Sequence, residues 1–483
     1  MKLKRSKNKM IERFLQGFLI IILVILTIFM MNDVNKIQGN ARVINYAGII
    51  RGATQREIKL EISGNKNDSL IRYLDNIFDG LMDGGGKYQL TKLNDQKYQK
   101  KLVELNKSWI SLKEEIQKYP DTMNNMERMK GYAMGQVVDR IPFSVAGGDT
   151  YASIYGYTQK QYRESLDVQF DVAERAKKDF CGSGMYANTG LGLRGIGEAV
   201  GSTAVYPEND FDYLTDFILK DYNMLDDLKF DPENNEFLQG KIEMAKKVVE
   251  RMDGKAMVIT GGAGPMTTAI AIRDASSFLR DLVKDPENAD RLLDFCVDCN
   301  LKWIEYNQKV FGKVVVSMAD PATSTNLLSP KLFQRFSKPY IQKQLNGIKE
   351  LTGTIPGVHI CGHTKKIWND IVEVGYPSFS VDNCEDLAEL KAAIGDKVKI
   401  SGNVPPVEVM KNGTIDDVIQ SVQQCLIKGS DSPYGFSLAI GCQVPIGTTR
   451  ENIEAYIYAA RRYGRGAQKG KLCKGLYEEG LIQ

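Results

Sequence analysis

From residue 140 onward, short apolar runs alternate with longer amphipathic stretches. The apolar runs have the length and residue types of buried β-strands, and the stretches between them, such as 386–394 and 415–427, carry apolar side chains at helical spacing. The eight predicted strands are 142–147, 183–188, 256–261, 314–318, 357–361, 379–382, 398–402 and 436–440. Eight strands that alternate with helices over about 340 residues favour an α/β fold of the (β/α)8 TIM-barrel type, with a doubly wound open sheet as the alternative.

The start of the chain follows a different pattern. Six Lys and Arg residues within the first 13 positions precede an uncharged, mostly apolar run at 14–32. At about 1.5 Å per residue, this run is nearly as long as the hydrocarbon core of a bilayer is thick, and it predicts an uncleaved transmembrane helix. The sequence therefore predicts a membrane location with a single-pass N-terminal anchor, and the charge rule places the rest of the chain outside the cytoplasm.

Residues 33–122 are predicted to be a separate helical segment. Apolar residues recur there at a rough helical spacing, the glycines at 84–86 interrupt it, and Pro120 marks its end. The stretch at 40–56 resembles the helical sensor region of bacterial receptors, which normally continue with a returning helix and a second membrane span that we do not find in this sequence. The predicted organisation is thus an anchor at 1–32, a truncated sensor-like segment at 33–122 and a barrel at 123–483.

Composition narrows the function further. The chain has 63 Lys and Arg against 60 Asp and Glu residues, and this net charge of +3 argues against nucleic acid as the main partner. Its eight cysteines are scattered without the spacing of a disulfide framework, which is typical of reduced, intracellular proteins. Cysteine usage therefore suggests a cytoplasmic barrel and conflicts with the side of the membrane that the charge rule gives.

Both histidines of the chain, His359 and His363, lie in one short segment. His359 and Cys361 are two positions apart at the end of a predicted strand, so their side chains point to the same side. Cys442 follows another predicted strand, and one His with two Cys ligands suits Zn²⁺ with a coordination position left open for chemistry. We therefore predict that His359, Cys361 and Cys442 bind zinc. His363 is predicted to be a surface residue or a neighbour that supports the ligands.

Two aspartates also follow predicted strands. Asp320 and Asp382 are candidates for accepting a proton or orienting a metal ligand, with helix caps or turn residues as the alternative. The glycine-rich stretch at 190–195 fits a dinucleotide-binding fingerprint only loosely and is predicted to be an active-site loop. Cys296 and Cys299 lie within a helical run, where buried helix packing is the favoured interpretation.

The region from about 126 to 466 resembles the uroporphyrinogen decarboxylase superfamily, and most closely its zinc-dependent methylcobamide:thiol methyltransferases, such as those that methylate coenzyme M. The segments that carry the resemblance are Asp139-Arg-Ile-Pro142, Ala319-Asp-Pro-Ala322, Leu328-Ser-Pro330, Val358-His-Ile-Cys-Gly362, Ser380-Val-Asp382, Ser401-Gly-Asn403 and Ile440-Gly-Cys442. The resemblance implies a (β/α)8 barrel in which His359, Cys361 and Cys442 are the zinc ligands.

Two departures separate the chain from the decarboxylases of that superfamily. The decarboxylases carry an arginine-rich Arg-Gln-Ala-Gly-Arg loop that holds the carboxylates of the substrate, where this chain has Ser144-Val-Ala-Gly-Gly-Asp149. They also have a histidine in a Gly-His-Gly segment, where this chain has Gly441-Cys442-Gln443. Both departures weaken a role in the porphyrin pathway.

The predicted function is methyl transfer from a methylcobamide, carried by a partner corrinoid protein, to a small thiol acceptor that a zinc ion would bind and deprotonate. Asp320 or Asp382 would receive the proton or steady a ligand. The alternatives are decarboxylation of a tetrapyrrole without a cofactor, and a membrane-tethered sensor or binding module without turnover.

Overall fold

The computed structural model describes residues 43, 68–118, 121–180 and 184–483 of the chain. It divides into two compact units, Met1–Pro120 and Asp121–Gln483. The predicted anchor at 14–32 lies outside the described residues, as does the receptor-like stretch at 40–56 apart from Val43. The predicted boundaries after residues 32 and 122 stay a prediction.

The predicted membrane location has to be corrected. Among the residues that the structure describes, no helix combines the length and the apolar character needed to cross a bilayer. Helix α3 (Gln96–Lys118) is 23 residues long, for example, but Lys and Glu residues recur along it. The single-pass anchor and the association with a membrane that depended on it are therefore withdrawn.

The first unit contains a pair of helices with a small apolar core. Helix α2 (Asp68–Asp83) buries the stripe Ile71, Leu74, Ile77, Phe78 and Leu81, which follows helical spacing. From α3, Trp109 stacks on Phe78 with ring centroids 6.3 Å apart. Its indole Nε1–H donates to Asp75 Oδ1 at 2.8 Å, so that the buried ring keeps a hydrogen-bond partner. These contacts join the two helices.

The second unit is built around a parallel β-sheet with the order β10-β9-β8-β7-β6-β5-β2, in which every pairing is parallel. Its strands are β2 (Ala187–Asn188), β5 (Val258–Ala263), β6 (Val315–Ala319), β7 (Val358–Ile360), β8 (Ser378–Val381), β9 (Lys399–Val404) and β10 (Phe436–Ile440). Phe143 adds a parallel bridge to Leu438 of β10. The predicted α/β fold with a parallel sheet is confirmed, and its strand order is consistent with a (β/α)8 barrel.

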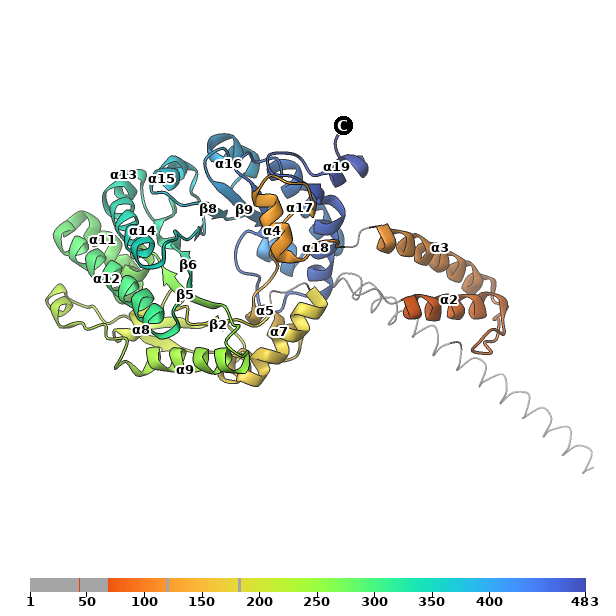
Figure 1. Ribbon diagram of the computed structural model, residues 1–483, viewed down its shortest axis with the longest axis horizontal. Coiled ribbons are helices and arrows are strands. Elements are labelled where there is room, and N and C mark those ends of the chain that lie inside the picture. The colour runs from red at the N-terminus through yellow and green to blue at the C-terminus, as the bar shows by residue number, and fades with distance from the viewer. Residues whose placement is uncertain (1–42, 44–67, 119–120, 181–183) are drawn as a thin grey trace, which may run out of the picture. The chain divides into compact units, whose positions relative to one another are not determined.

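Helices separate these strands along the chain and surround them in Figure 1. They are α4 (Asn125–Ala133), α5 (Gly148–Ile154), α6 (Gln159–Glu164), α7 (Leu166–Phe180), α8 (Gly195–Ala199), α9 (Glu236–Arg251), α10 (Pro265–Ile272), α11 (Ala275–Lys284), α12 (Pro286–Phe311), α13 (Pro330–Leu332), α14 (Lys338–Thr352), α15 (Trp368–Glu373), α16 (Leu387–Ile394), α17 (Ile415–Gly429), α18 (Arg450–Tyr463) and α19 (Lys474–Glu478). Strand residues such as Ile400, Phe436 and Leu438 are fully buried. Cys296 and Cys299 are buried in α12, as predicted.

Two predicted strands are shorter in the structure. Of the stretch predicted at 142–147, only its start pairs with β10, where Ser144 N–H donates to Leu438 O at 3.1 Å. The chain then turns into α5, for which Gly147 is the N-cap residue. Just before it, β1 (Val138–Arg140) pairs antiparallel with β11 (Arg465–Ala467) instead. Strand β2 covers only the end of the predicted 183–188, because Gly184 has a φ of +78°, outside the β region.

Candidate metal centre and adjoining cavity

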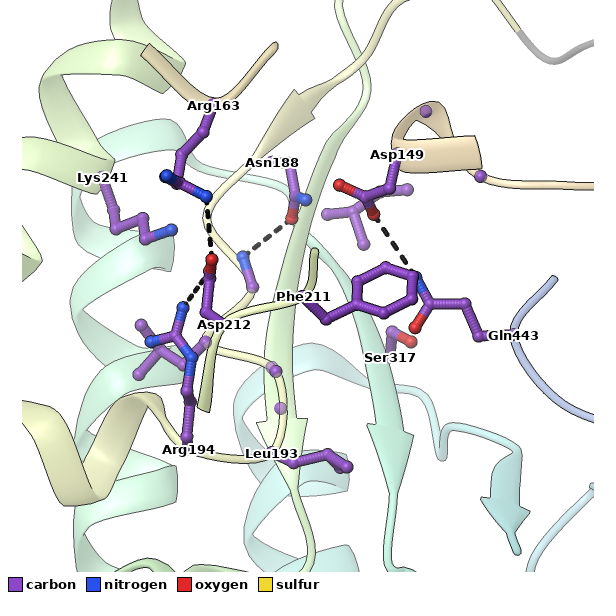
Figure 2. Close-up of a pocket in the computed structure, with 18 of the residues that line it drawn as sticks. Asp149, Arg163, Asn188, Leu193, Arg194, Phe211, Asp212, Lys241, Ser317 and Gln443 are labelled. Atoms are coloured by element: carbon purple, nitrogen blue, oxygen red, sulfur yellow. Dashed lines mark hydrogen bonds and ion pairs between the residues drawn. The ribbon is translucent and has the colours of Figure 1, made fainter. Parts of the chain in front are cut away.

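A cavity of about 1390 Å³ is lined by residues of β2, β5 and β6 and of the loops at their carboxyl ends. In a parallel α/β fold, this end of the strands is where ligands bind. The cavity floor includes Ser317 of β6, and Gln443, which follows β10, forms part of its rim (Figure 2). Gln443 is adjacent in sequence to Cys442, and Ala319 of the cavity lining pairs in register with His359. The cavity therefore borders the predicted metal ligands.

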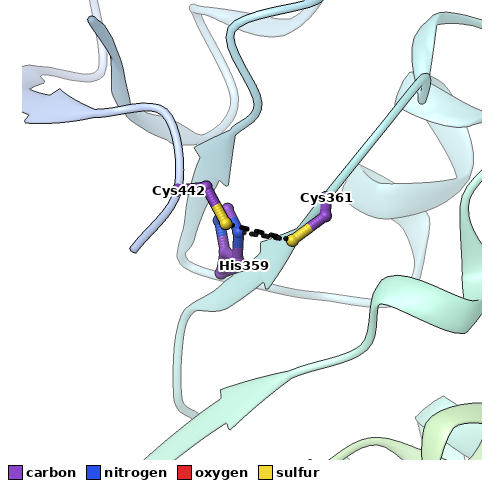
Figure 3. Close-up of side chains that lie close together, drawn as sticks. All are labelled: His359, Cys361 and Cys442. Atoms are coloured by element: carbon purple, nitrogen blue, oxygen red, sulfur yellow. Dashed lines mark hydrogen bonds between the residues drawn. The ribbon is translucent and has the colours of Figure 1, made fainter. Parts of the chain in front are cut away.

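The three predicted ligand residues come together in the structure (Figure 3). His359 lies in β7, Cys361 follows β7 directly, and Cys442 follows β10. His359 Nε2 is 3.0 Å from Cys361 Sγ, which is 3.4 Å from Cys442 Sγ. All three donor atoms lie within 4.8 Å of one another, and all three residues are half-buried. One nitrogen and two sulfur donors at this spacing suit a tetrahedral zinc ion with an open fourth position.

Strong curvature of the sheet brings Cys361 and Cys442 together. Strands β7 and β10 are separated by β8 and β9 in the sheet order. In a flat sheet, three strand spacings would hold them about 14 Å apart. Two sulfur atoms 3.4 Å apart therefore require the strand ends to converge across the mouth of the sheet.

Ser380 of β8 fixes the orientation of the His359 ring. Nδ1 lies 3.2 Å from the backbone oxygen of Ser380 and 3.1 Å from its Oγ. Because a carbonyl oxygen can only accept, Nδ1–H is the donor and Nε2 keeps its lone pair. That lone pair faces the sulfur of Cys361, as a metal-binding imidazole requires.

The pKa values of the two neighbouring thiols shift in opposite directions. Interactions with Cys361 and with His359 lower the pKa of the Cys442 thiol, whereas the contact with Cys442 and burial raise the pKa of Cys361. Two thiolates this close repel each other, so that the second ionises only if a cation is present. A divalent metal supplies that charge, and the chemistry of this donor set therefore fits a metal ion.

Asp382 supports the loop that carries Cys361. Its Oδ2 accepts the backbone N–H of Gly362 at 2.8 Å, and its Oδ1 accepts that of Cys384 at 3.0 Å. Gly362 has a φ of +82°, and a Cβ there would lie 2.5 Å from Asn326 Oδ1, so only glycine fits this turn. Asp382 therefore holds together the loops that follow β7 and β8.

Asp320 is buried away from the ligand donor atoms. Its Oδ1 accepts from the backbone N–H and the hydroxyl of Thr267 in α10, at 2.9 and 2.6 Å. Its Oδ2 packs against Gly264 and has no hydrogen-bond partner among the described residues. Burial raises the pKa of this carboxyl to about 7. The backbone N–H of Asp320 donates to the carbonyl of His359 at 2.9 Å, so the residue supports β7 through its backbone.

His363 lies apart from this cluster. Its side chain is 59% exposed, with Nδ1 3.8 Å from Glu385 Oε1, and it groups with Cys384 and Glu385. Of the two roles predicted for it, that of a surface residue agrees with this exposure. The glycine-rich loop predicted at 190–195 lines the cavity, where Gly190, Leu191, Gly192, Leu193 and Arg194 face the open space.

Several polar residues of the site were missed by sequence reasoning. Ser380 belongs to the family-like Ser380-Val-Asp382 motif, but its contact with His359 depends on the pairing of β7 with β8. Arg163, Arg194 and Lys241 line the cavity, but basic residues in or near amphipathic helices look like solvated surface residues. Asp149, at the end of the Ser144-Val-Ala-Gly-Gly-Asp149 segment, accepts a hydrogen bond from Gln443 at 3.4 Å. In the sequence, the position of Asp149 after the predicted strand 142–147 is the signal that could have identified it as a residue of the site.

A family model described as Uroporphyrinogen decarboxylase (URO-D) matches residues 124–463. The methylcobamide:CoM methyltransferase MtaA of Methanosarcina barkeri is 29% identical over 223 residues, which are 46% of this chain and 63% of that protein. MtbA of Methanosarcina acetivorans is 29% identical over 231 residues, 47% of this chain and 65% of that protein. The uroporphyrinogen decarboxylase of Pseudoalteromonas atlantica is 26% identical over 247 residues, 50% of this chain and 68% of that protein.

A solved structure, a methyltransferase from Methanosarcina mazei, has a TM-score of 0.58 to this chain at 21% identity. The match covers 70% of this chain and 98% of the other, and at this identity it shows a shared fold. The match to the two CoM methyltransferases spans a little less than two thirds of their length.

Proposed function

The chain belongs to the uroporphyrinogen decarboxylase family, and we propose that it transfers a methyl group from a methylcobamide, carried by a corrinoid protein, to a thiol acceptor. The observation that carries this proposal is the convergence of His359 Nε2, Cys361 Sγ and Cys442 Sγ within 4.8 Å beside a large cavity. The similarity to MtaA and MtbA supports the same reaction class. The barrel closure that brings the strand ends together is part of this proposal.

In the proposed reaction, a sulfur–carbon bond forms as the cobalt–carbon bond breaks. Cobalt keeps the electron pair of the broken bond, and the thiol proton is released. A zinc ion, when bound by His359, Cys361 and Cys442, would supply Lewis acidity that makes the acceptor thiol ionise at neutral pH.

The residues around the donor atoms fix their positions. Ser380 holds the His359 ring with Nε2 toward the sulfur atoms, and Asp382 holds the loop that carries Cys361. Asp382 is half-buried at the strand ends, so of the two aspartates it is the one placed to receive the released proton. Asp320 is 0% exposed, and we assign it a supporting role under β7 rather than contact with substrate.

Decarboxylation of a tetrapyrrole is the less favoured function. The segment at 144–149 brings Asp149 to the cavity, where the decarboxylases have arginines for the carboxylates of their substrate. The position of their Gly-His-Gly histidine is occupied by Cys442, whose sulfur lies beside Cys361. A decarboxylation that uses no metal would not need two neighbouring thiols at this place.

Metal content and methyl transfer test the proposal together. The purified full chain is expected to hold about one zinc ion and to methylate a thiol from a methylcobamide donor. Cys442→Ser should lose both properties, whereas Cys384→Ser, which removes an exposed thiol outside the cluster, should keep them. A folded wild-type protein that takes up no zinc would refute the proposal, as would full zinc content in Cys442→Ser.

A further inference from the structure

One wall of the cavity carries a lysine that makes no direct ion pair with any described residue. Lys241 of α9 lines the cavity, and Figure 2 shows its side chain directed toward Arg163 and Asp212. Its Nζ lies 5.7 Å from the ring centroid of Phe237 and forms no ion pair or hydrogen bond with any residue that the structure describes. Burial and the nearby Arg194 lower the pKa of Lys241, and the opposing effects of Glu198 and Asp212 do not offset them. An enclosed ammonium group without a partner is unfavourable unless a ligand supplies the opposite charge.

The two neighbouring guanidinium groups are already neutralised. Arg163 Nη1 is 2.8 Å from Asp212 Oδ1, and Arg194 binds both Asp212 and Glu198. Asp212 and Glu198 are thus taken up by the two arginines, and Asp149 and Asp210 also line the cavity without an ion pair to Lys241. Lys241 is therefore the cation on this wall that is left to bind a ligand.

The arginines are also held in place. Tyr206 lies between them, with its ring centroid 5.1 Å from the guanidinium carbon of Arg163 and 4.9 Å from that of Arg194. Its hydroxyl bonds to Glu198, which in turn binds Arg194. The cationic wall is therefore built before any ligand arrives, which lowers the entropy lost on binding.

The size of the cavity points to a ligand of more than a few atoms. Its volume of about 1390 Å³ exceeds the range of about 300–1,000 Å³ that is typical of pockets for drug-sized ligands. Its two edges differ in chemistry, since Gln443 and Asp149 lie on the side of Cys442 whereas Lys241 lies on the other side in Figure 2. A ligand that spans the cavity would meet the ligand donor atoms and the cationic wall at different ends.

We propose that Lys241, flanked by Arg163 and Arg194, binds an oxyanion group of the ligand that fills the cavity. The group is a carboxylate, sulfonate or phosphate, and it belongs either to the thiol acceptor or to a phosphorylated second ligand. The inference rests on the proposed function for the identity of the reacting end, but the oxyanion subsite itself requires neither zinc nor methyl transfer.

Binding of inorganic sulfate to the full chain, measured by isothermal titration calorimetry, tests the subsite. Lys241→Met keeps most of the aliphatic stem and should weaken sulfate binding about tenfold or more, because a hydrogen bond to a charged group is lost. Lys247→Met is the matched control, since Lys247 is exposed on the same helix and should be neutral. Equal affinity of Lys241→Met and wild type for sulfate would overturn the proposal, as would the absence of sulfate binding to wild type.

A second variant changes the charge in the opposite direction. Asp212→Asn removes a carboxylate from the wall and should tighten sulfate binding several-fold. Weaker binding in this variant, with the fold intact by circular dichroism, would contradict the electrostatic account.

Competition experiments separate the two sources of the oxyanion. Displacement of sulfate by 3-mercaptopropionate but not by 3-mercaptopropanol would assign the group to the acceptor, whereas displacement by inorganic phosphate alone would assign it to a phosphorylated ligand. If neither 3-mercaptopropionate nor inorganic phosphate displaces sulfate, the proposed oxyanion subsite is refuted. A chain that binds sulfate through Lys241 but takes up no zinc would refute the proposed methyl transfer and leave the subsite standing.

Discussion

Cys361 Sγ and Cys442 Sγ lie 3.4 Å apart, although the two residues are 81 positions apart in the sequence. This contact joins the end of β7 to the end of β10 and places two potential thiolates where only one can ionise without a cation. The predictions below test what holds this pair in place and what the surrounding groups contribute.

The first prediction concerns oxidation of the metal-free protein. With zinc removed by a chelator and hydrogen peroxide added as oxidant, Cys361 and Cys442 should form a disulfide, because a thiolate at Cys442 lies beside the second sulfur. Mass spectrometry of a peptide digest should find this link in the metal-free protein and not in zinc-loaded protein. A link from Cys442 to Cys384 instead would show that the observed proximity is not the one in solution.

Ser380→Ala should lower the affinity for zinc by roughly tenfold. Loss of a group that orients a metal ligand typically costs about 10–100-fold in metal affinity. The smaller loss is expected here because the Ser380 backbone oxygen still accepts from His359 Nδ1. Competition with a chromophoric chelator measures the change. Ser401→Ala provides a control, since Ser401 pairs with Ser380 from the neighbouring strand. An equal loss in both variants would mean that the effect is a general one of the sheet.

Asp320 should make stability depend on pH. Burial raises the pKa of its carboxyl to about 7, above its ordinary value of 3.8, so the folded chain keeps a proton that the unfolded chain has lost. The free energy of unfolding should therefore fall as pH rises from about 4 to about 7, by on the order of a few kcal/mol, and then level off. Urea unfolding at several pH values measures this slope. Asp320→Asn, which cannot ionise, should flatten it, and an unchanged slope would contradict the assignment.

Gly441→Ala should displace Cys442 and weaken metal binding. A Cβ at position 441 would lie 2.7 Å from the backbone nitrogen of Asn383, closer than a carbon can approach, so the backbone must move. The expected result is a loss of zinc affinity of about tenfold or more, with a modest drop in melting temperature. Zinc titration and thermal unfolding of the same samples distinguish this local effect from global unfolding, which would abolish the cooperative thermal transition rather than shift it modestly.

The elements with a regular spacing of apolar and polar residues were predicted most accurately from the sequence. Strand β10 begins and ends at the predicted residues 436 and 440, and α16 and α17 begin within one residue of their predicted starts. Here alternation of apolar segments with amphipathic helices gives an unambiguous pattern. The strands at 142–147 and 183–188 were overestimated, because glycines next to apolar residues end the pairing early and periodicity does not register this.

The candidate site was predictable where local geometry decides it. His359 and Cys361 share one side of a strand at any curvature of the sheet, and the barrel expectation added Cys442. The role of Ser380 depends on the register between β7 and β8, and the burial of Asp320 depends on packing against α10. Neither property is encoded in the neighbouring residues of the sequence. The unpaired state of Lys241 likewise appears only when α9 is placed beside the loop that carries Asp212.

An ion held by His359, Cys361 and Cys442 would also cross-link two distant parts of the chain. It would close a covalent-like loop that contains β8, α16, β9, α17 and β10, so that these elements could separate only after a metal–sulfur bond had broken. Amide hydrogens in β8 and β9 should then exchange with solvent much more slowly in the loaded protein than in the stripped one. Loss of the metal would thus expose the segment 361–442 to proteases, linking the lifetime of the protein to its metal supply.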